Sequence, residues 1–458
     1  MPLMHKRHLD AEAQRARMLN TPIPKIVTAM ALPAVLHQLI SVLYNLVDTY
    51  FVSQIGTSAA AAVGVAFSLT SVVNALAYGI VMGGKALISR RLGAGDDEAA
   101  HTIASTAAVM CLAVGIFCTV FGLIFLKPIL RFFGASPTMM PHAVPYCRII
   151  LFGITFYCVD GALNAVLQAQ GMVAYATSAF ITASICNAIM DYIFVIVIPL
   201  GAAGAALATA LSQLISFTIL LTAFVRKKSC VKIHPKYISR KIFTYLDIVQ
   251  NGVATVFRQG VASVSSTLLN RLANPYGDAA VAAISIANKI YMLCRSLVLG
   301  FGNGFQPVVG FNYGAGRKDR VKKAFRFAFL VGTAMCLVCA AVLALFPETI
   351  IHLFRDDPEV VAIGAQMLRY LVISLPFLGF STYVNQTYQC LGFSFWATVL
   401  ACCRQGIFFV PALYLLHHFF GLTGITMTQA AADLLTAAVS VPFYFYFFNK
   451  LLNKKKTL

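Results

Sequence analysis

The chain has 458 residues, of which 59% are hydrophobic and only 11% are charged, and its mean hydropathy is +0.79. Soluble domains carry about 25% charged residues, so this composition excludes an ordinary soluble protein. The net charge of +19 would suit a nucleic-acid-binding protein, but the positions of the basic residues, described below, argue against that class.

The chain begins with 25 mostly polar and charged residues. They contain no short apolar core with a small-residue cleavage site, so we expect a cytoplasmic tail rather than a signal peptide. Apolar runs of about 20 residues follow, long enough to cross a bilayer as helices. Their centres lie near residues 40, 72, 113, 158, 186, 214, 258, 292, 335, 376, 406 and 436. We therefore predict an all-α integral membrane protein with twelve transmembrane helices.

The basic residues cluster on one side of this predicted topology. They lie in the N-terminal tail, after the second span (Lys85, Arg90, Arg91), between Arg226 and Lys241, after the eighth span, and at Lys454–Lys456. Such a bias is typical of cytoplasmic loops. We expect a multi-pass protein with both termini in the cytoplasm and no nucleic-acid partner.

The two halves of the chain match each other at a constant offset of 221 residues. The matches are Gly56 with Gly277, Gly79 with Gly300, Gly83 with Gly304, Gly93–Gly95 with Gly314–Gly316, Gln168 with Gln389, Gly171 with Gly392, and Ala176–Thr177 with Ala397–Thr398. Because each half holds an even number of spans, the repeat is parallel. Two such six-helix bundles suit alternating access of a carrier.

The repeat also predicts the boundaries of the two bundles. We expect a cytoplasmic tail at 1–25, an N-lobe with spans 1–6 at 26–225, and a cytoplasmic linker at 226–244. A C-lobe with spans 7–12 follows at 245–448, and a basic cytoplasmic tail occupies 449–458.

Four acidic residues fall inside predicted spans: Asp48, Asp160, Asp191 and Asp433. An ionisable group at bilayer depth is expensive and usually marks a functional path. Asp48 lies in the first span with Tyr44 one helical turn before it, on the same face. Further back in that span, the ring of a proline (Pro33) should kink the helix.

Other polar residues share helix faces in the same half. Asn187 and Asp191 are four residues apart in the fifth span; Asp160, Asn164 and Gln168 form a stripe along the fourth; Thr209 and Gln213 are paired in the sixth. Together they could form a pocket rich in oxygen atoms. Desolvation and a neighbouring carboxylate would let such an acid carry a proton, whereas two carboxylates with amide and hydroxyl oxygens could hold a small cation. The plain alternative is hydrogen bonding between helices, which we favour for Gln168 and Gln213.

The second half carries basic residues inside its spans: Arg258, Lys289, Arg295, Arg369 and Arg404. We expect Asp433 to pair with Arg404 as a structural contact, because spans 11 and 12 are neighbours.

Nucleotide binding finds little support. The stretch Gly79–Ala86 approximates a phosphate-binding loop but ends in Ala86, which lacks the hydroxyl that binds Mg²⁺. We therefore expect no ATP and no cofactor, with an ion gradient as the energy source.

Along nearly its whole length the chain resembles the multidrug and toxic compound extrusion (MATE) family, particularly its DinF-like and MepA-like bacterial members. The matching features are the first-span proline with Val47–Asp48–Thr49 and Phe51–Gly56, the loops Gly93–Gly95 and Asn312–Gly316, Asn187 with Asp191, Gly204–Ala206 with Ala208–Thr209, and Arg404–Gln405 before Pro411. The resemblance implies a transporter, not an enzyme, in the bacterial plasma membrane. It implies export of small cationic or amphipathic compounds in exchange for H⁺ or Na⁺, in contact with membrane lipid. We expect a monomer.

The resemblance also implies a site in the N-lobe. Asp48, Asn187, Asp191 and Thr209 match the ion-coupling positions of the family, and these residues would hold Na⁺ if Na⁺ is the coupling ion. Tyr44, Tyr146, Asn164 and Asp160 surround them, and Pro33 matches the proline where the first helix is thought to bend. A second branch of the family uses acids in spans 7 and 8, where this chain has none.

Three alternative functions can be compared with the sequence. A major-facilitator carrier shares the six-plus-six repeat, but the loop Ser89–Asp97 does not fit its motif. A lipid-linked oligosaccharide flippase of the same superfamily would line its cavity with cations, as the basic residues of the second half allow. A membrane prenyltransferase needs paired acidic motifs on one side of the membrane, whereas the candidates at Asp96–Glu98 and Asp356–Glu359 fall on opposite sides.

Overall fold

The computed structural model describes residues 12–55 and 57–446. The predicted C-terminal tail at 449–458, part of the N-terminal tail, and Gly56 of the repeat lie outside the described residues. The described chain is helical, without a β-strand. A short helix at 12–20 precedes the first span.

The helices of the first half are α2 (Ile23–Ser53), α3 (Thr57–Ala94), α4 (Asp97–Ile124), α5 (Leu126–Phe132), α6 (Met140–Ala169), α7 (Val173–Asp191), the π-helical turn η1 (Tyr192–Val197) and α8 (Ala202–Val225). A turn η2 (Pro235–Tyr237) lies in the linker. The second half contains α9 (Ile242–Ala273), η3 (Asn274–Tyr276), α10 (Asp278–Gly314), α11 (Lys318–Leu345), α12 (Pro347–His352), α13 (Pro358–Leu391), α14 (Ser394–Cys402), the π-helical turn η4 (Cys403–Ile407) and α15 (Phe409–Tyr446).

These helices account for the twelve predicted membrane crossings. Ten helical segments in the described chain are long and apolar enough to span a bilayer. One of them, Ser394–Tyr446, is 53 residues long and is broken at Gly421, so it supplies two crossings. The remaining crossing is α9, which is less apolar because it carries charged residues such as Arg258. The predicted all-α membrane fold is therefore confirmed.

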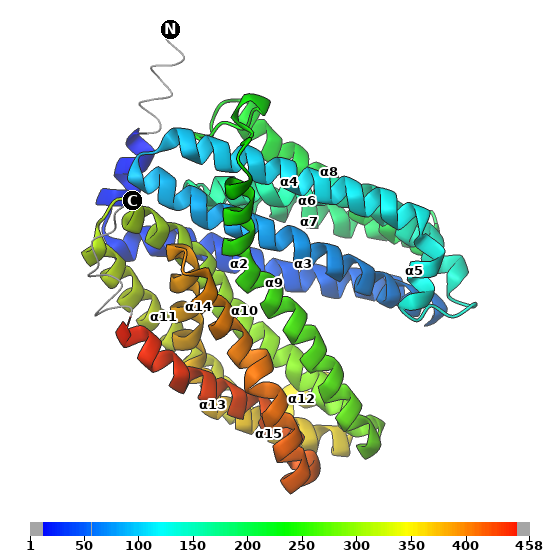
Figure 1. The fold of residues 1–458 in the computed structure, drawn as a ribbon. Helices are drawn as coiled ribbons and strands as arrows, with labels where there is room; N and C mark the ends of the chain where they lie inside the picture. Colours follow the sequence, from blue (N-terminus) through cyan, green and yellow to red (C-terminus); the bar gives the residue numbers. More distant parts are fainter. Residues whose placement is uncertain (1–11, 56, 447–458) are drawn as a thin grey trace. The chain divides into compact units, whose positions relative to one another are not determined.

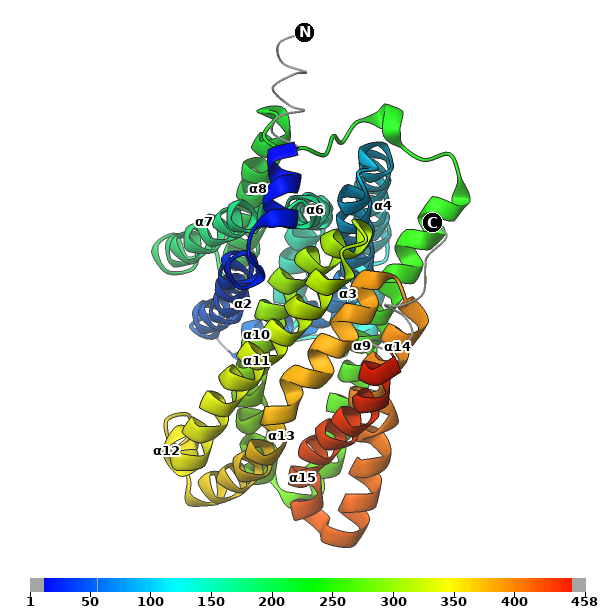
Figure 2. The ribbon, with the colours of Figure 1, turned by 90° about the vertical axis from the view of Figure 1, so that its left-hand side faces the viewer.

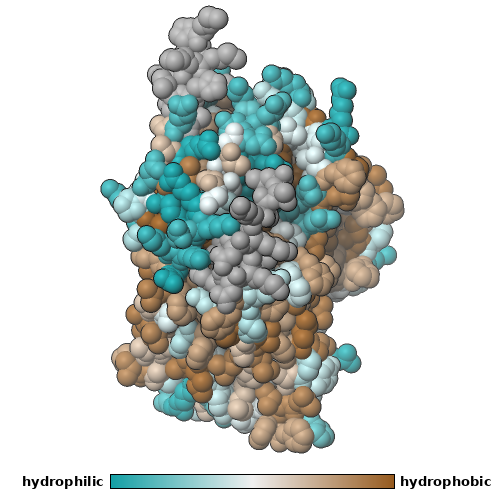
Figure 3. All heavy atoms as spheres, turned by 60° about the vertical axis from the view of Figure 1, so that its left-hand side comes forward, coloured by the Kyte–Doolittle hydropathy of each residue, from teal (hydrophilic) through white to brown (hydrophobic). Residues whose placement is uncertain are grey.

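The surface agrees with a lipid environment. Many large apolar side chains are exposed, among them Phe117, Leu345 and Phe419. Figure 3 shows a broad region of hydrophobic side chains on one face, with hydrophilic side chains gathered toward its borders. Apolar patches of this extent are not stable in water, and lipid tails would cover them.

The described chain forms two compact units. The first contains the described residues up to Thr21 together with Leu36–Gly252; the second contains Pro22–Val35 and the described residues from Val253 on. In the first unit α6 is the central helix and packs against α3, α4 and α8 (Figure 1). In the second unit α13 takes this role and packs against α10, α11 and α15 (Figure 2).

Two helices have one part in each unit. The beginning of α2 belongs to the second unit and its remainder to the first, whereas α9 begins in the first unit and continues in the second. The lobes predicted at 26–225 and 245–448 place most of α2 in the N-lobe and most of α9 in the C-lobe, and these bounds stay a prediction.

Glycines explain how the beginning of α9 fits into the first unit. A Cβ atom at Gly83 of α3 would collide with the carbonyl of Ile248, and one at Gly252 would collide with the carbonyl of Gly79. The absence of side chains lets the two backbones approach closely.

The second unit repeats this arrangement with the beginning of α2. A Cβ at Gly304 of α10 would collide with the backbone of Ala31, and a Cβ at Gly300 would lie 2.7 Å from the Cα atom of Val35. The repeated glycines of α3 thus pack against α9, and those of α10 pack against α2, so each set contacts the first helix of the other half. This contact is the physical reason for that part of the sequence repeat.

The linker is attached to the first unit. His101, Ser105 and Thr106 of α4 accept hydrogen bonds from linker N–H groups at 3.3, 3.2 and 3.0 Å. The buried side chain of Gln170 accepts a further one from the N–H of Cys230 at 2.9 Å. The linker therefore follows the surface of this unit up to the start of α9.

Candidate ion-coupling site

Two carboxylates, one buried and one partly buried, lie near each other in the first unit. Asp48 of α2 is close enough to Asp191 of α7 for their charges to interact. Asp191 is 0% exposed, and neither of its carboxylate oxygens has a hydrogen-bond partner in the described structure; the same holds for one oxygen of Asp48. Polar atoms buried in this way normally have a partner, so this pair is a candidate for binding a proton or an ion.

A change in helix geometry accompanies Asp191. It is the last residue of α7, and the π-helical turn η1 follows directly. Asn187, one turn earlier, is also buried, and neither its amide nitrogen nor its oxygen has a partner among the described residues. π-Helical turns occur frequently at functional sites, because they re-aim side chains and disturb the ladder of hydrogen bonds.

Three further predicted residues surround the two carboxylates. The hydroxyl of Tyr44 faces Thr209 of α8 and lies within electrostatic range of both acids. Tyr146 of α6 is buried and also lies within range of both. The structure therefore places the predicted residues Tyr44, Tyr146 and Thr209 in the same region as Asp48, Asp191 and Asn187.

The polar stripe of α6 continues away from this group. Gln168 donates to the Oδ1 atom of Asn164 at 2.5 Å and accepts from the Nζ atom of Lys85 at 2.7 Å. At the other end of the stripe, one carboxylate oxygen of Asp160 is buried without a partner in the described chain.

The position of Lys85 corrects one part of the sequence interpretation. We counted it among the basic residues that follow the second span, but α3 continues to Ala94 and the Lys85 side chain is only 3% exposed. The sequence does not show that the helix continues beyond Lys85, because Arg90 and Arg91 are charged residues of the kind expected in the loop after a span.

Pro33 lies inside α2, near the point where the helix passes from one compact unit to the other. Proline has no amide hydrogen, so the helical hydrogen bond to the carbonyl of Ala29 is missing. Pro33 thus removes one hydrogen bond from α2, and bending at this residue stays a prediction.

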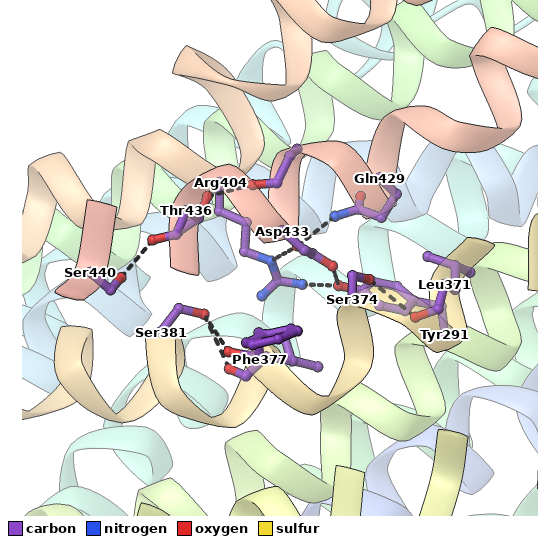
Figure 4. A network of polar contacts seen from close by, with 12 residues as sticks. Tyr291, Leu371, Ser374, Phe377, Ser381, Arg404, Gln429, Asp433, Thr436 and Ser440 are labelled. Atoms are coloured by element: carbon purple, nitrogen blue, oxygen red, sulfur yellow. Dashed lines mark hydrogen bonds and ion pairs between the residues drawn. The ribbon is translucent and has the colours of Figure 1, made fainter. Parts of the chain in front are cut away.

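In the second unit, the predicted contact between Arg404 and Asp433 is present and belongs to a larger network (Figure 4). Arg404 also donates to the hydroxyl of Tyr291, and Tyr291 donates to Asp433. Gln429 donates to Asp433 at 3.0 Å. Sequence reasoning missed these two partners; Gln429 could have been found, because it lies four residues before Asp433 on the same helix face.

The residues of the first unit fit a small hard cation as well as a proton. Carboxylate, amide and hydroxyl oxygens are the ligands that such cations prefer, and Asp48, Asn187, Asp191 and Thr209 offer all three types. The described residues contain no group of three or more His, Cys, Asp or Glu side chains that could hold a metal ion, so an ion here would need amide and hydroxyl oxygens in addition to the two carboxylates.

Comparison with known proteins identifies the family. The family model described as MatE matches residues 33–193 and 254–415, one segment in each half. The multidrug export protein MepA of Staphylococcus haemolyticus (strain JCSC1435) is 24% identical over 440 residues, covering 96% of this chain and 97% of that protein.

Two solved structures share the fold. One, described as MATE in the straight conformation, matches with a TM-score of 0.90 at 25% identity and covers 96% of this chain and 99% of its own. Another, described as MATE in the bent conformation, matches with a TM-score of 0.89 at 25% identity, covering 96% and 98%. Since the family model spans well over half of the sequence and recurs in both halves, this chain belongs to the MatE family of membrane transporters.

Proposed function

We propose that the chain is a secondary active efflux transporter that exports cationic or amphipathic compounds in exchange for H⁺ or Na⁺. The observation that carries this proposal is the pair Asp48 and Asp191, two neighbouring carboxylates in the membrane whose oxygens largely lack partners. The likeness to MepA, a multidrug export protein, supports the substrate class.

The energetics of the pair suit coupling. Two carboxylates at this depth are costly when charged, so they favour states in which a proton or cation is bound. An ion that enters down the membrane potential gains about 2.3 kcal/mol per 100 mV. That free energy can maintain about a fortyfold gradient of a neutral substrate.

We assign the following roles. Asp48 and Asp191 bind the ion, with oxygens of Asn187 and Thr209 available to Na⁺. Tyr44 and Tyr146 border the site, and Asp160 and Asn164 extend it along α6. Bending of α2 at Pro33 then alters the position of Asp48 relative to Asp191 and releases substrate during alternating access. The straight and bent conformations described for a related MATE protein are consistent with such a step.

The same proposal includes the setting of the protein. The positive-inside bias favours an orientation with both termini in the cytoplasm. The likeness to the staphylococcal MepA protein supports a bacterial plasma membrane. We propose a monomer that uses neither ATP nor a cofactor.

The test is dye efflux from vesicles containing the purified full-length protein, with a pH gradient and a sodium gradient imposed separately. We expect one gradient to drive efflux, Asp48→Asn to abolish it, and Asp97→Asn, at an exposed acid of α4, to leave it unchanged. Efflux by Asp48→Asn at the normal rate, or efflux that requires ATP, would refute the proposal.

A flippase for lipid-linked oligosaccharides is the second candidate, because basic residues lie inside the second unit. Vesicles that translocate such a lipid but no cationic dye would favour it. The family match removes the major-facilitator alternative.

A further inference from the structure

Positive charge accumulates in the middle of the second unit. Arg258 lies halfway along α9 and Arg295 halfway along α10, and Arg404 lies in the π-helical turn η4. The electrostatic surroundings of Arg295 include Arg404, Tyr291, Arg258 and Asp433, so the three guanidinium groups and the one carboxylate lie in one region. Asp433 is the one acidic residue in this half of the sequence that lies inside a long helix, away from its ends.

The carboxylate of Asp433 is already engaged by other groups. Its Oδ1 atom accepts from Arg404 at 2.7 Å and from Gln429 at 3.0 Å. Its Oδ2 atom accepts from the hydroxyl of Tyr291. The negative charge of Asp433 is therefore already offset by the guanidinium of Arg404.

Arg295 is an arginine of this region for which the described residues show no ion pair. It lies four residues after Tyr291 on α10, and therefore on the same helix face. Its Nε atom is buried and has no hydrogen-bond partner, and none of the ion pairs in the described residues includes it. By contrast, Arg369 on α13 is paired with Glu348 at 2.8 Å.

A partly buried guanidinium without an ion-pair partner is unfavourable at membrane depth. Its planar set of N–H donors matches the oxygens of a carboxylate or phosphate group, which it can bind in a bidentate manner. Arg258 would add attraction for the same negative charge, whereas the charge of Arg404 is offset by Asp433.

We propose that the second unit contains a binding site for an oxyanion, a carboxylate or phosphate group carried by an amphipathic molecule. Arg295 binds the oxyanion, Arg258 adds positive charge, and the contact with Asp433 and Tyr291 fixes Arg404 nearby. This site is separate from the proposed coupling carboxylates. It extends the ligands of the protein from cations to molecules that carry an anionic group.

The test measures binding of octyl phosphate to the full-length protein in nanodiscs of phosphatidylcholine, by titration calorimetry, with empty nanodiscs subtracted. Octyltrimethylammonium, which has the same chain but a cationic head, serves as the comparison ligand. We expect Arg295→Gln to weaken octyl phosphate binding at least about tenfold, since a hydrogen-bonded charge pair contributes on that scale. Lys289→Gln, which removes an exposed positive charge from the same helix, should change affinity less than about twofold.

Two controls keep the result interpretable. If Arg295→Gln does not fold, Arg258→Gln takes its place, with an expected loss of at least about threefold. Asp48→Asn should bind octyl phosphate normally even when it no longer exports dye, so failure of the coupling proposal and failure of this one can be told apart. Wild-type affinity in a folded Arg295→Gln protein, or equal binding of octyltrimethylammonium at the same site, overturns the proposal.

The oxyanion could come from a lipid headgroup or from a soluble amphipath, and a second arm separates these sources. Phosphatidylglycerol is added to the nanodiscs in increasing proportion. If a headgroup occupies the site, octyl phosphate affinity falls as phosphatidylglycerol rises, and phosphatidylglycerol remains with the purified wild-type protein but not with Arg295→Gln. If the ligand is soluble, octyl phosphate affinity is unaffected by phosphatidylglycerol.

Discussion

Arg404 and Asp433, which are 29 residues apart in the sequence, form a buried ion pair in which Nε and Oδ1 are separated by 2.7 Å. Tyr291 joins both partners, so each charge has a second polar neighbour. A buried pair of this kind is costly to break, because removal of one partner leaves the other charge without compensation.

Breaking this pair should destabilise the protein. We expect Asp433→Asn to lower the free energy of unfolding by about 3–5 kcal/mol. Arg369→Gln, which breaks the exposed pair of Arg369 with Glu348, should cost about 1 kcal/mol or less. Thermal unfolding in detergent, followed by intrinsic fluorescence, measures both. Equal effects of the two variants would contradict a structural role for the buried pair.

The close contact between α3 and α9 predicts a sharp difference between two glycines of α9. Gly252→Leu should prevent folding, because even a Cβ atom there collides with the carbonyl of Gly79. Gly260 has no atom within 4 Å of its ideal Cβ position, so Gly260→Ala should be tolerated and should stabilise the helix by up to about 1 kcal/mol. Yield of monodisperse protein after purification reports the outcome; a well-folded Gly252→Leu protein would show that the helices do not pack this way.

If Asp48 and Asp191 act as one site, their substitutions should not add. Asp48→Asn and Asp191→Asn should each reduce gradient-driven efflux to background, and the double variant should match the single ones. Initial rates of dye efflux from vesicles provide the comparison. Measurable residual efflux in both single variants that falls further in the double variant would show that the two acids act independently.

Substitution of Pro33 should raise the stability of the protein and lower its transport rate. Pro33→Ala restores the N–H that α2 lacks, so we expect higher thermal stability, by up to about 3 kcal/mol, together with efflux reduced at least about tenfold. Pro376→Ala, at a proline inside α13, is the matched control and should leave the efflux rate unchanged. Unaltered efflux by Pro33→Ala would remove the bending step from the mechanism.

Much of the fold follows from the sequence, because lipid permits so few structures. Each long apolar run could only be a helix, and the break at Gly421 separates two crossings that one uninterrupted helix could not supply. The contact between Asp433 and Arg404 was also predictable, since opposite charges in neighbouring spans have few other partners. The proximity of Asp48 and Asp191 was expected from the MATE resemblance, and their coupling role stays a prediction.

Other features depend on contacts that a single sequence does not reveal. The hydroxyl of Tyr291 is 142 residues from Asp433 in sequence, and no spacing rule connects them. Lys85 resembled a loop residue, although its Nζ atom reaches Gln168 within the helix bundle. The repeated glycines were visible as a pattern, but their partners, Ala31 and Gly252, lie in the opposite half of the chain.

Each compact unit contains the beginning of the other half's first helix, and this affects attempts to divide the protein into two fragments. A fragment that ends within the linker would lack the start of α9, and with it the surface that Gly79 and Gly83 contact. The complementary fragment would lack Pro22–Val35, which Gly300 and Gly304 contact. Neither fragment could complete its own packing, but the two expressed together could supply each other's missing helix.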